Sequence, residues 1–254
     1  MIAVVQFVRQ FLIDGFERGD YTYGTLHVVS IALMLVSIPL LVLHYRKQTE
    51  EVVRRDLVIL AWITLFFYII RRGVEVYQGK PLVEAYWPFY LCNVNTVGLS
   101  LLLIFDIRKG RDFFLVTGMS GAILMFVVPE GVFNDRYLTL QIFESLLSHY
   151  MIFIVPIILF TTRRHDLDVR NAWQAVLGLL LVLFNVEFLQ ELVTGRYVDY
   201  LFLSGPIDLS LWGIPQVFVM LFLAILYVYL VYALDYVFTG RWILSSTEPL
   251  RKKG

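Results

Sequence analysis

Long apolar runs separated by short polar stretches dominate the chain from residue 25 onward. Seven runs approach the roughly 20 residues that a helix needs to cross the hydrocarbon core of a bilayer. They cover Thr25–His44, Leu57–Val76, Tyr86–Phe105, Phe113–Val128, Leu140–Phe160, Ala172–Leu192 and Leu211–Tyr232. The loops between them leave no room for a separate soluble domain. The pattern therefore predicts an all-α integral membrane protein, a bundle of seven transmembrane helices.

The two ends of the chain differ from these runs. The first, IAVVQFVRQFLIDGF, has a wide apolar face, so we expect an amphipathic helix that lies in the membrane interface or packs on the end of the bundle. It lacks the basic lead and small-residue cleavage site of a signal peptide. We divide the chain into an interfacial segment (1–24), a transmembrane domain (25–238) and a basic cytoplasmic tail (239–254).

Composition and charge agree with a membrane protein. Hydrophobic residues make up 59% of the chain and charged residues 17%, with a mean hydropathy of +0.72. The net charge of zero gives no reason to expect a nucleic-acid partner. With the N-terminus outside, the inner segments carry fourteen Lys and Arg residues and the outer segments seven. This bias predicts an outer N-terminus and a cytoplasmic C-terminus in the plasma or inner membrane.

Polar residues inside the runs gather near the expected outer ends. Such residues are costly in lipid and usually face the bundle interior or a wet cavity. Cys92 lies about six residues, roughly 9 Å, into the third run, and Asn95 and Thr96 follow on the same helical face. His149 lies on the order of 13 Å into the fifth run, one turn from Ser145. The pattern predicts a polar cavity that opens outward above an apolar floor.

The chain has a single cysteine, which excludes an internal disulfide and a cysteine-built metal site. A cysteine in a membrane helix ordinarily serves as a small packing residue. Beside an imidazole, however, a thiol becomes a strong nucleophile, so Cys92 and His149 together suffice for acyl transfer through a thioester. Asn95, or a backbone N–H near Pro88, would then donate to the oxyanion. The sequence leaves open whether the two side chains meet.

Two other classes of function compete with this one. A zinc hydrolase needs clustered ligands, and the four histidines fall on both sides of the predicted topology, so we expect no metal and no cofactor. A transporter would show internal repeats or matched broken helices, and we find no convincing repeat. A non-enzymatic binder or transporter of a small polar or lipidic ligand is the second hypothesis. There Cys92 only packs, while Arg72, Asn95 and Glu187 make the contacts.

Four motifs carry a resemblance to a known family. They are YGTLH at 23–27, WPFYLCN at 87–93, SLLSHYM at 145–151, and TGRYVDYLFLSGP with WGIP within 194–215. In these motifs the chain resembles the YwaF-like family of bacterial integral membrane proteins, which is related to the eukaryotic transmembrane family containing an ether-phospholipid acyltransferase. The resemblance implies seven spans, with Cys92 as nucleophile and His149 as base. The chain departs from it at Tyr90 (a histidine in the family), at Asp199 (an asparagine) and in one absent late proline.

Together these features predict a membrane-embedded lipid-modifying enzyme, a Cys–His acyltransferase or acyl hydrolase. Its partners would be membrane phospholipid or lysophospholipid and the bilayer itself, with no nucleic acid; no oligomeric state follows from the pattern. The catalytic residues expected are Cys92 and His149. The substrate-binding residues expected are Asn95, Thr96, His27, Tyr90, Ser145, Arg72 and Asn185.

Overall fold

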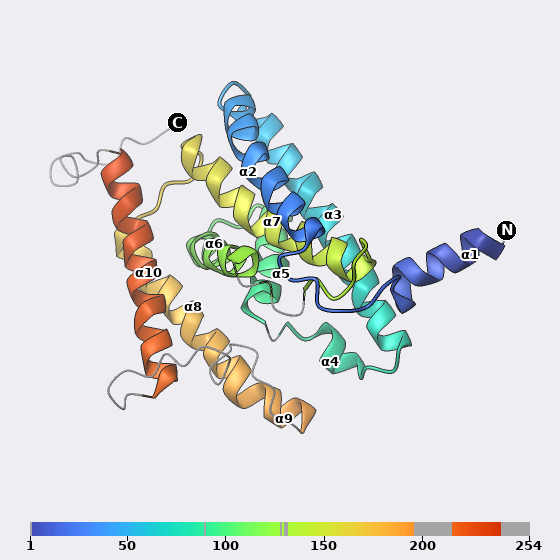
Figure 1. The fold of residues 1–254 in the computed structure, drawn as a ribbon. Helices are drawn as coiled ribbons and strands as arrows, with labels where there is room; N and C mark the ends of the chain where they lie inside the picture. The colour runs from blue at the N-terminus through green and yellow to red at the C-terminus, as the bar shows by residue number, and fades with distance from the viewer. Residues whose placement is uncertain (1, 89, 128, 130–131, 196–214, 240–254) are drawn as a thin grey trace, which may run out of the picture.

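A computed structural model describes residues 2–88, 90–127, 129, 132–195 and 215–239 (Figure 1). Within them the regular elements are helices, which confirms the all-helical prediction. They are α1 (Ile2–Arg9), α2 (Thr25–Tyr45), α3 (Glu50–Tyr77), α4 (Leu82–Tyr86), α5 (Leu91–Ile104), α6 (Arg111–Val127), α7 (Leu140–Thr161), α8 (Ala172–Phe184), α9 (Gln190–Thr194) and α10 (Gln216–Thr239), with short helical turns at Gln10–Asp14, Val169–Asn171 and Asn185–Leu189. The predicted tail and the late motif lie almost entirely outside the described residues.

Four of the described helices are long and apolar enough to cross a membrane: α2, α3, α7 and α10. The helices α5 and α8 are apolar but shorter. Of the four, α7 is the most buried, whereas α2 and α10 expose most of their apolar side chains. Exposed apolar side chains along long helices are what a lipid-facing surface requires.

The third predicted run is not one continuous helix. The short helix α4 ends at Tyr86, and Trp87 has an extended backbone because the ring of Pro88 disfavours helical conformation in the residue before it. Helix α5 starts only at Leu91 and has 14 residues, about 21 Å of rise. Cys92 therefore lies in the first turn of its helix rather than six residues into a continuous one.

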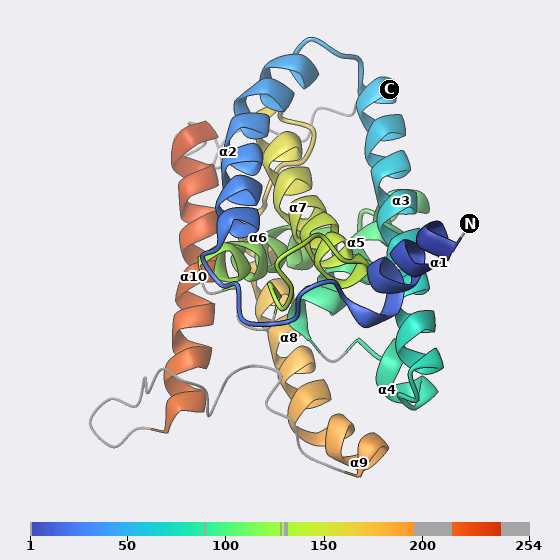
Figure 2. The same cartoon turned by 45° about the vertical axis from the view of Figure 1, so that its right-hand side comes forward.

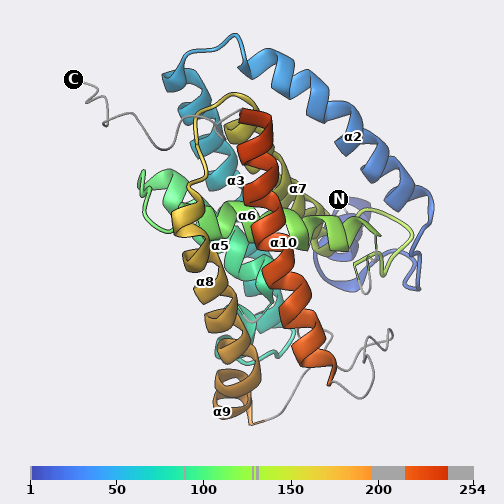
Figure 3. The same cartoon turned by 90° about the vertical axis from the view of Figure 1, so that its left-hand side faces the viewer.

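Helix α6 lies across its neighbours rather than alongside them. In Figure 1 it is seen end-on while α2, α7, α8 and α10 are seen from the side, and in Figure 3 it crosses behind α10. It contacts α5, α7, α8 and α10. The fourth predicted run is thus helical but is not a parallel member of a bundle. The sixth run is helical from Ala172, and a π-helical turn at Asn185–Leu189 joins α8 to α9.

Two phenylalanines at the start of α6 pack against glycines of the neighbouring helices. A Cβ at Gly98 of α5 would overlap the ring of Phe114, and a Cβ at Gly178 of α8 would overlap the ring of Phe113. The absence of a side chain at these two positions therefore allows α6 to pack closely between α5 and α8. Around this crossing lies the main apolar core, built from α3, α5, α6 and α7.

The N-terminal segment is attached to the bundle only through its second half. Helix α1 projects away from the other helices in Figure 1, whereas in the turned view of Figure 2 it lies in front of α3. It exposes Val4, Val5 and Phe7. The carboxylate of Asp135, 1% exposed, accepts backbone hydrogen bonds from Phe16 at 2.7 Å and from Glu17 at 3.0 Å. The chain from Phe16 onward is thereby fixed to the loop before α7.

Candidate functional site

A network of charged side chains joins the end of α3 to the first turns of α7. Glu75 accepts from Arg71 and Arg72 at 3.0 Å each and from Lys80 at 3.1 Å. Arg71 also reaches Glu144 of α7 at 3.2 Å. Three cations thus share two carboxylates, an arrangement whose desolvation cost is offset only by close pairing.

The innermost part of this network contains hydrogen-bond donors without acceptors. The Arg72 guanidinium lies 4.7 Å from the centroid of the Tyr68 ring, within range of a cation–π interaction. Arg72 and Tyr68 are 6% and 3% exposed, yet Arg72 Nε and the Tyr68 hydroxyl have no hydrogen bond of good geometry. The hydroxyl of Thr96 on α5 is equally buried and also unpaired. Such groups are rare in native interiors because each carries an uncompensated desolvation penalty.

Cys92 lies beside this network in the first turn of α5. Its side chain packs against the apolar core. The hydrogen bond that its sulfur makes is a long one, 3.9 Å, to Oδ1 of Asn93. Among the described residues no hydrogen bond joins Cys92 to His149, so the two predicted catalytic side chains are not paired in this conformation.

His149, 8% exposed, lies on α7 five residues after Glu144. Its Nδ1 is 2.7 Å from the carbonyl oxygen of Ser145 and 3.4 Å from the Ser145 hydroxyl. A carbonyl can only accept, so Nδ1 carries the proton and Nε2 is the basic nitrogen of the ring. In the part of the chain that the structure describes, Nε2 has no hydrogen-bond partner. His149 is therefore held in the tautomer that a general base requires.

His27, also predicted to bind substrate, has a different role. It is fully buried at the start of α2, where its Nδ1 accepts from the backbone N–H of Tyr23 at 3.1 Å. Its Nε2 lies 3.0 Å from the carbonyl oxygen of Phe126 at the end of α6. Both ring nitrogens are occupied by the protein itself, so His27 fastens α2 to α6 and is not brought next to Cys92.

The two asparagines among the predicted residues also form contacts between helices. Asn95 is fully buried; its amide donates to the carbonyl of Leu91 at 3.0 Å, and its Oδ1 lies 2.9 Å from the hydroxyl of Thr117 on α6. Asn185 accepts from the indole N–H of Trp87 at 2.6 Å and donates to the carbonyl of Pro88 at 3.3 Å. Asn185 thus holds the extended segment that leads into Cys92.

Tyr90 directly precedes α5 as its N-cap residue and is 39% exposed. Of the nine predicted residues, Cys92 and Thr96 lie one turn apart on α5, and Arg72 lies on α3, which contacts α5. His149 and Ser145 lie on the adjacent face of α7. His27, Asn95 and Asn185 serve as contacts between elements.

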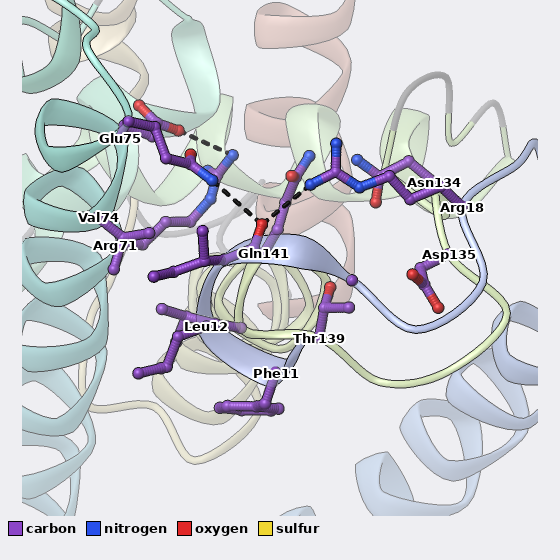
Figure 4. A pocket seen from close by; sticks show the side chains of 14 residues that line it. Phe11, Leu12, Arg18, Arg71, Val74, Glu75, Asn134, Asp135, Thr139 and Gln141 are labelled. Atoms are coloured by element: carbon purple, nitrogen blue, oxygen red, sulfur yellow. Dashed lines mark hydrogen bonds and ion pairs between the residues drawn. The ribbon is translucent and has the colours of Figure 1, made fainter. Parts of the chain in front are cut away.

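A polar pocket of about 310 Å³ lies at the same end of α3, beneath the N-terminal segment (Figure 4). Arg71 and Glu75 lie on one side of it, and Arg18 and Asp135 on the other. The carbonyl of Ile13 accepts from Arg18 at 2.9 Å and from Gln78 at 3.1 Å, which seats the segment over the pocket. None of the nine predicted residues lines this pocket.

Sequence reasoning did not include Glu144 or Ser148 among the site residues. The Ser148 hydroxyl donates to Glu144 at 2.8 Å, one helical turn away. An acidic residue inside an apolar run, with a hydroxyl four residues later, was the available signal. The described residues contain no group of three or more His, Cys, Asp or Glu side chains that could hold a metal ion.

Comparisons with known proteins place the chain in a family. The sequence model of the TMEM164 family matches residues 22–235, which include α2 through most of α10. No curated protein and no solved structure matches the chain. Since the match extends over most of the sequence, the chain belongs to the TMEM164 family, a family of membrane proteins.

Proposed function

We propose that this TMEM164 family member is a membrane-embedded acyltransferase or acyl hydrolase of phospholipids, with Cys92 as nucleophile and His149 as base. The observation that carries the proposal is the tautomer of His149, whose Nδ1 proton is donated to Ser145 and whose Nε2 is left basic. The resemblance in the motifs around these residues supports it. The proposal includes the YwaF-like bacterial assignment, seven spans and an outer N-terminus.

The reaction would proceed in two balanced steps. Nε2 of His149 removes the thiol proton, and the Cys92 sulfur attacks the carbonyl carbon of a phospholipid ester. A carbon–sulfur bond forms and the ester carbon–oxygen bond breaks, and the departing glycerol oxygen takes the proton from His149. A lysophospholipid hydroxyl, or water, then gives its proton to His149, attacks the thioester and releases the thiol.

Catalysis requires the Cys92 sulfur and His149 Nε2 to come within hydrogen-bonding reach. Free enzymes often hold such pairs more loosely than their substrate complexes do. Cys92 is well situated for a small movement because it lies in the first turn of α5, shortly after Trp87, whose backbone is extended. We propose that lipid binding displaces Trp87 and Pro88 and brings the thiol toward α7.

The experiment is acyl transfer by the purified full chain in proteoliposomes, with acyl-labelled phospholipid as donor and lysophospholipid as acceptor. Cys92→Ala and His149→Ala should abolish transfer and also abolish hydroxylamine-sensitive label on the protein. His44→Ala is the matched control, because His44 is an exposed histidine at the end of α2. Full turnover in both site variants would disprove the proposal.

The second candidate is a non-enzymatic binder of a lipidic ligand, favoured by the lack of a hydrogen bond between Cys92 and His149. The two candidates differ in the reactivity of the thiol at neutral pH. An activated Cys92 should react rapidly with maleimide and slow several-fold in His149→Ala. A packing cysteine should react slowly in both proteins.

A further inference from the structure

A second pocket lies at the opposite end of α3, away from the candidate site. Its volume is about 760 Å³, within the range of small-molecule sites, and it lies among the first turns of α3 and α6 and the ends of α5 and α7. Buried apolar side chains, among them Val53, Leu57 and Leu159, form part of its wall. Arginines are its most frequent charged residues: Arg54, Arg108, Arg111, Arg163 and Arg164. We call this the arginine pocket.

The arginine pocket is lined by five arginines and four carboxylates. Asp106 is shared between Arg54 and Arg111 at 3.5 Å each, which is long for an ion pair. Arg164 directs its guanidinium to backbone carbonyls in the loop after α2. Arg108 and Arg163 form no ion pair among the described residues. Several guanidinium groups therefore face the pocket without an anionic partner.

Glu50 and Glu51 also line the pocket, but they lie in the first turn of α3. The partial positive charge of a helix N-terminus stabilises carboxylates there, so they need no arginine. His165 also lines the pocket, and its Nε2 lies 2.6 Å from Oδ1 of Asp112 on α6. Asp166 also lines the pocket, so its arginines exceed its carboxylates by one.

A buried, unpaired donor marks the wall of the pocket. Arg111, the first residue of α6, is 8% exposed, and its Nε has no hydrogen-bond partner. The contact of Arg111 with Asp106 uses Nη2 only. The Nε and one Nη of a guanidinium can donate together to two oxygens of a phosphate. In Arg111 the Nε donor of this pair is buried and has no acceptor.

We propose that the arginine pocket binds a phosphate group, with Arg111 as the central ligand and Arg163 and Arg108 at the rim. Phosphate supplies the planar sets of acceptor oxygens that unpaired guanidinium forks require. The source is a phospholipid headgroup, whose glycerol and first acyl carbons pack on Val53 and Leu159, or a soluble phosphate. Arginines near a membrane surface also orient a protein in the bilayer, but that role needs no vacant donor and predicts no saturable binding.

Ligand-dependent thermal stability of the detergent-solubilised full chain tests the proposal, because a ligand that binds the folded state raises its melting temperature in a saturable way. One arm titrates inorganic phosphate against sodium chloride of equal ionic strength. The other arm compares mixed micelles containing phosphatidylglycerol with micelles containing diacylglycerol at the same mole fraction. Stabilisation by inorganic phosphate identifies a soluble source, and stabilisation by phosphatidylglycerol alone identifies a headgroup.

Three variants decide whether the binding occurs in this pocket. Arg111→Gln should weaken the stabilising ligand about ten-fold, as expected for the loss of a charge-assisted hydrogen-bond pair. Arg163→Gln should weaken it several-fold. Arg163 is exposed, so this variant remains informative if Arg111→Gln does not fold. Arg46→Gln is the matched control, since Arg46 lies after α2 and outside the pocket wall.

The proposal is overturned if neither ligand stabilises the wild-type chain, or if Arg46→Gln weakens binding as much as Arg163→Gln does. These outcomes are independent of acyl transfer, because the arginine pocket and Cys92 lie toward opposite ends of α3. The pocket proposal and the proposed function can therefore fail separately.

Discussion

The guanidinium of Arg71 and the carboxylate of Glu144 form an ion pair across helices α3 and α7, with Nη1 3.2 Å from Oε2. Glu144 is 3% exposed and Arg71 is partly exposed, so the pair connects the interior to the polar pocket beneath the N-terminal segment. Its strength determines how rigidly the candidate site is held.

Arg71→Ala should destabilise the protein by about 3 kcal/mol, because it leaves the buried Glu144 carboxylate without its cation. Arg136→Ala is the control: it removes an exposed pair with Glu17 and should cost less than about 1 kcal/mol. Chemical unfolding of the purified chain in detergent measures both changes. The double variant Arg71→Ala with Glu144→Ala should recover part of the loss; equal costs in Arg71→Ala and Arg136→Ala would refute the structural importance of the pair.

Gly98→Ala should destabilise the fold by about 1–3 kcal/mol, because the added methyl group overlaps the Phe114 ring where α5 meets α6. Gly121→Ala, on α6 itself, has open space around the new methyl group and should be neutral or slightly stabilising. Thermal unfolding of the two variants gives the comparison. If Gly98→Ala proves as stable as Gly121→Ala, the close packing of α6 on α5 is not as described.

Asn185→Leu should increase the labelling rate of Cys92 by maleimide about three-fold or more. The substitution removes both hydrogen bonds that hold the Trp87–Pro88 segment, so local opening next to the thiol needs less free energy. Cys92 is the chain's single cysteine, so the label reports on one position. Gln174→Leu, which removes a hydrogen bond elsewhere on α8, should leave the rate unchanged. Equal rates in both variants would show that Asn185 does not control this segment.

Helix α1 should lie in the membrane interface, because its apolar side chains Val4 and Val5 are exposed. A spin label at Val5, in a Cys92→Ala background, should collide more often with oxygen than with a water-soluble nickel reagent once the protein is in liposomes. A label at Lys47, in an exposed loop, should show the opposite preference. Preferential contact of the Val5 label with nickel would place α1 in water.

Much of the helical content was predictable because apolar runs of membrane length specify helices almost independently of their surroundings. Thr25–Tyr45 and Leu140–Thr161 agree with the predicted first and fifth runs within a residue at each end. The break before α5 was also readable, since Pro88 restricts Trp87. The crossing of α6 was not, because periodicity specifies a helix but not the direction of its axis.

The candidate site was predictable in its composition but not in its pairings. Polar residues near the ends of runs pointed to Arg72 and Cys92, which lie on the contacting helices α3 and α5. The partner of Arg71 is Glu144, and that depends on the rotation and register of two helices separated by more than 60 residues. From sequence, Asn95 and His27 were predicted to bind a ligand. The sequence does not reveal whether the hydrogen-bond partner of a buried amide or imidazole is a ligand or another helix.

Asp135 has a consequence for the order in which the chain assembles. Its carboxylate accepts the backbone amides of Phe16 and Glu17, which precede it by more than 115 residues. During synthesis Phe16 and Glu17 therefore cannot make these hydrogen bonds until over half of the polypeptide has emerged. Together they close the chain into a loop that encloses α2 to α6.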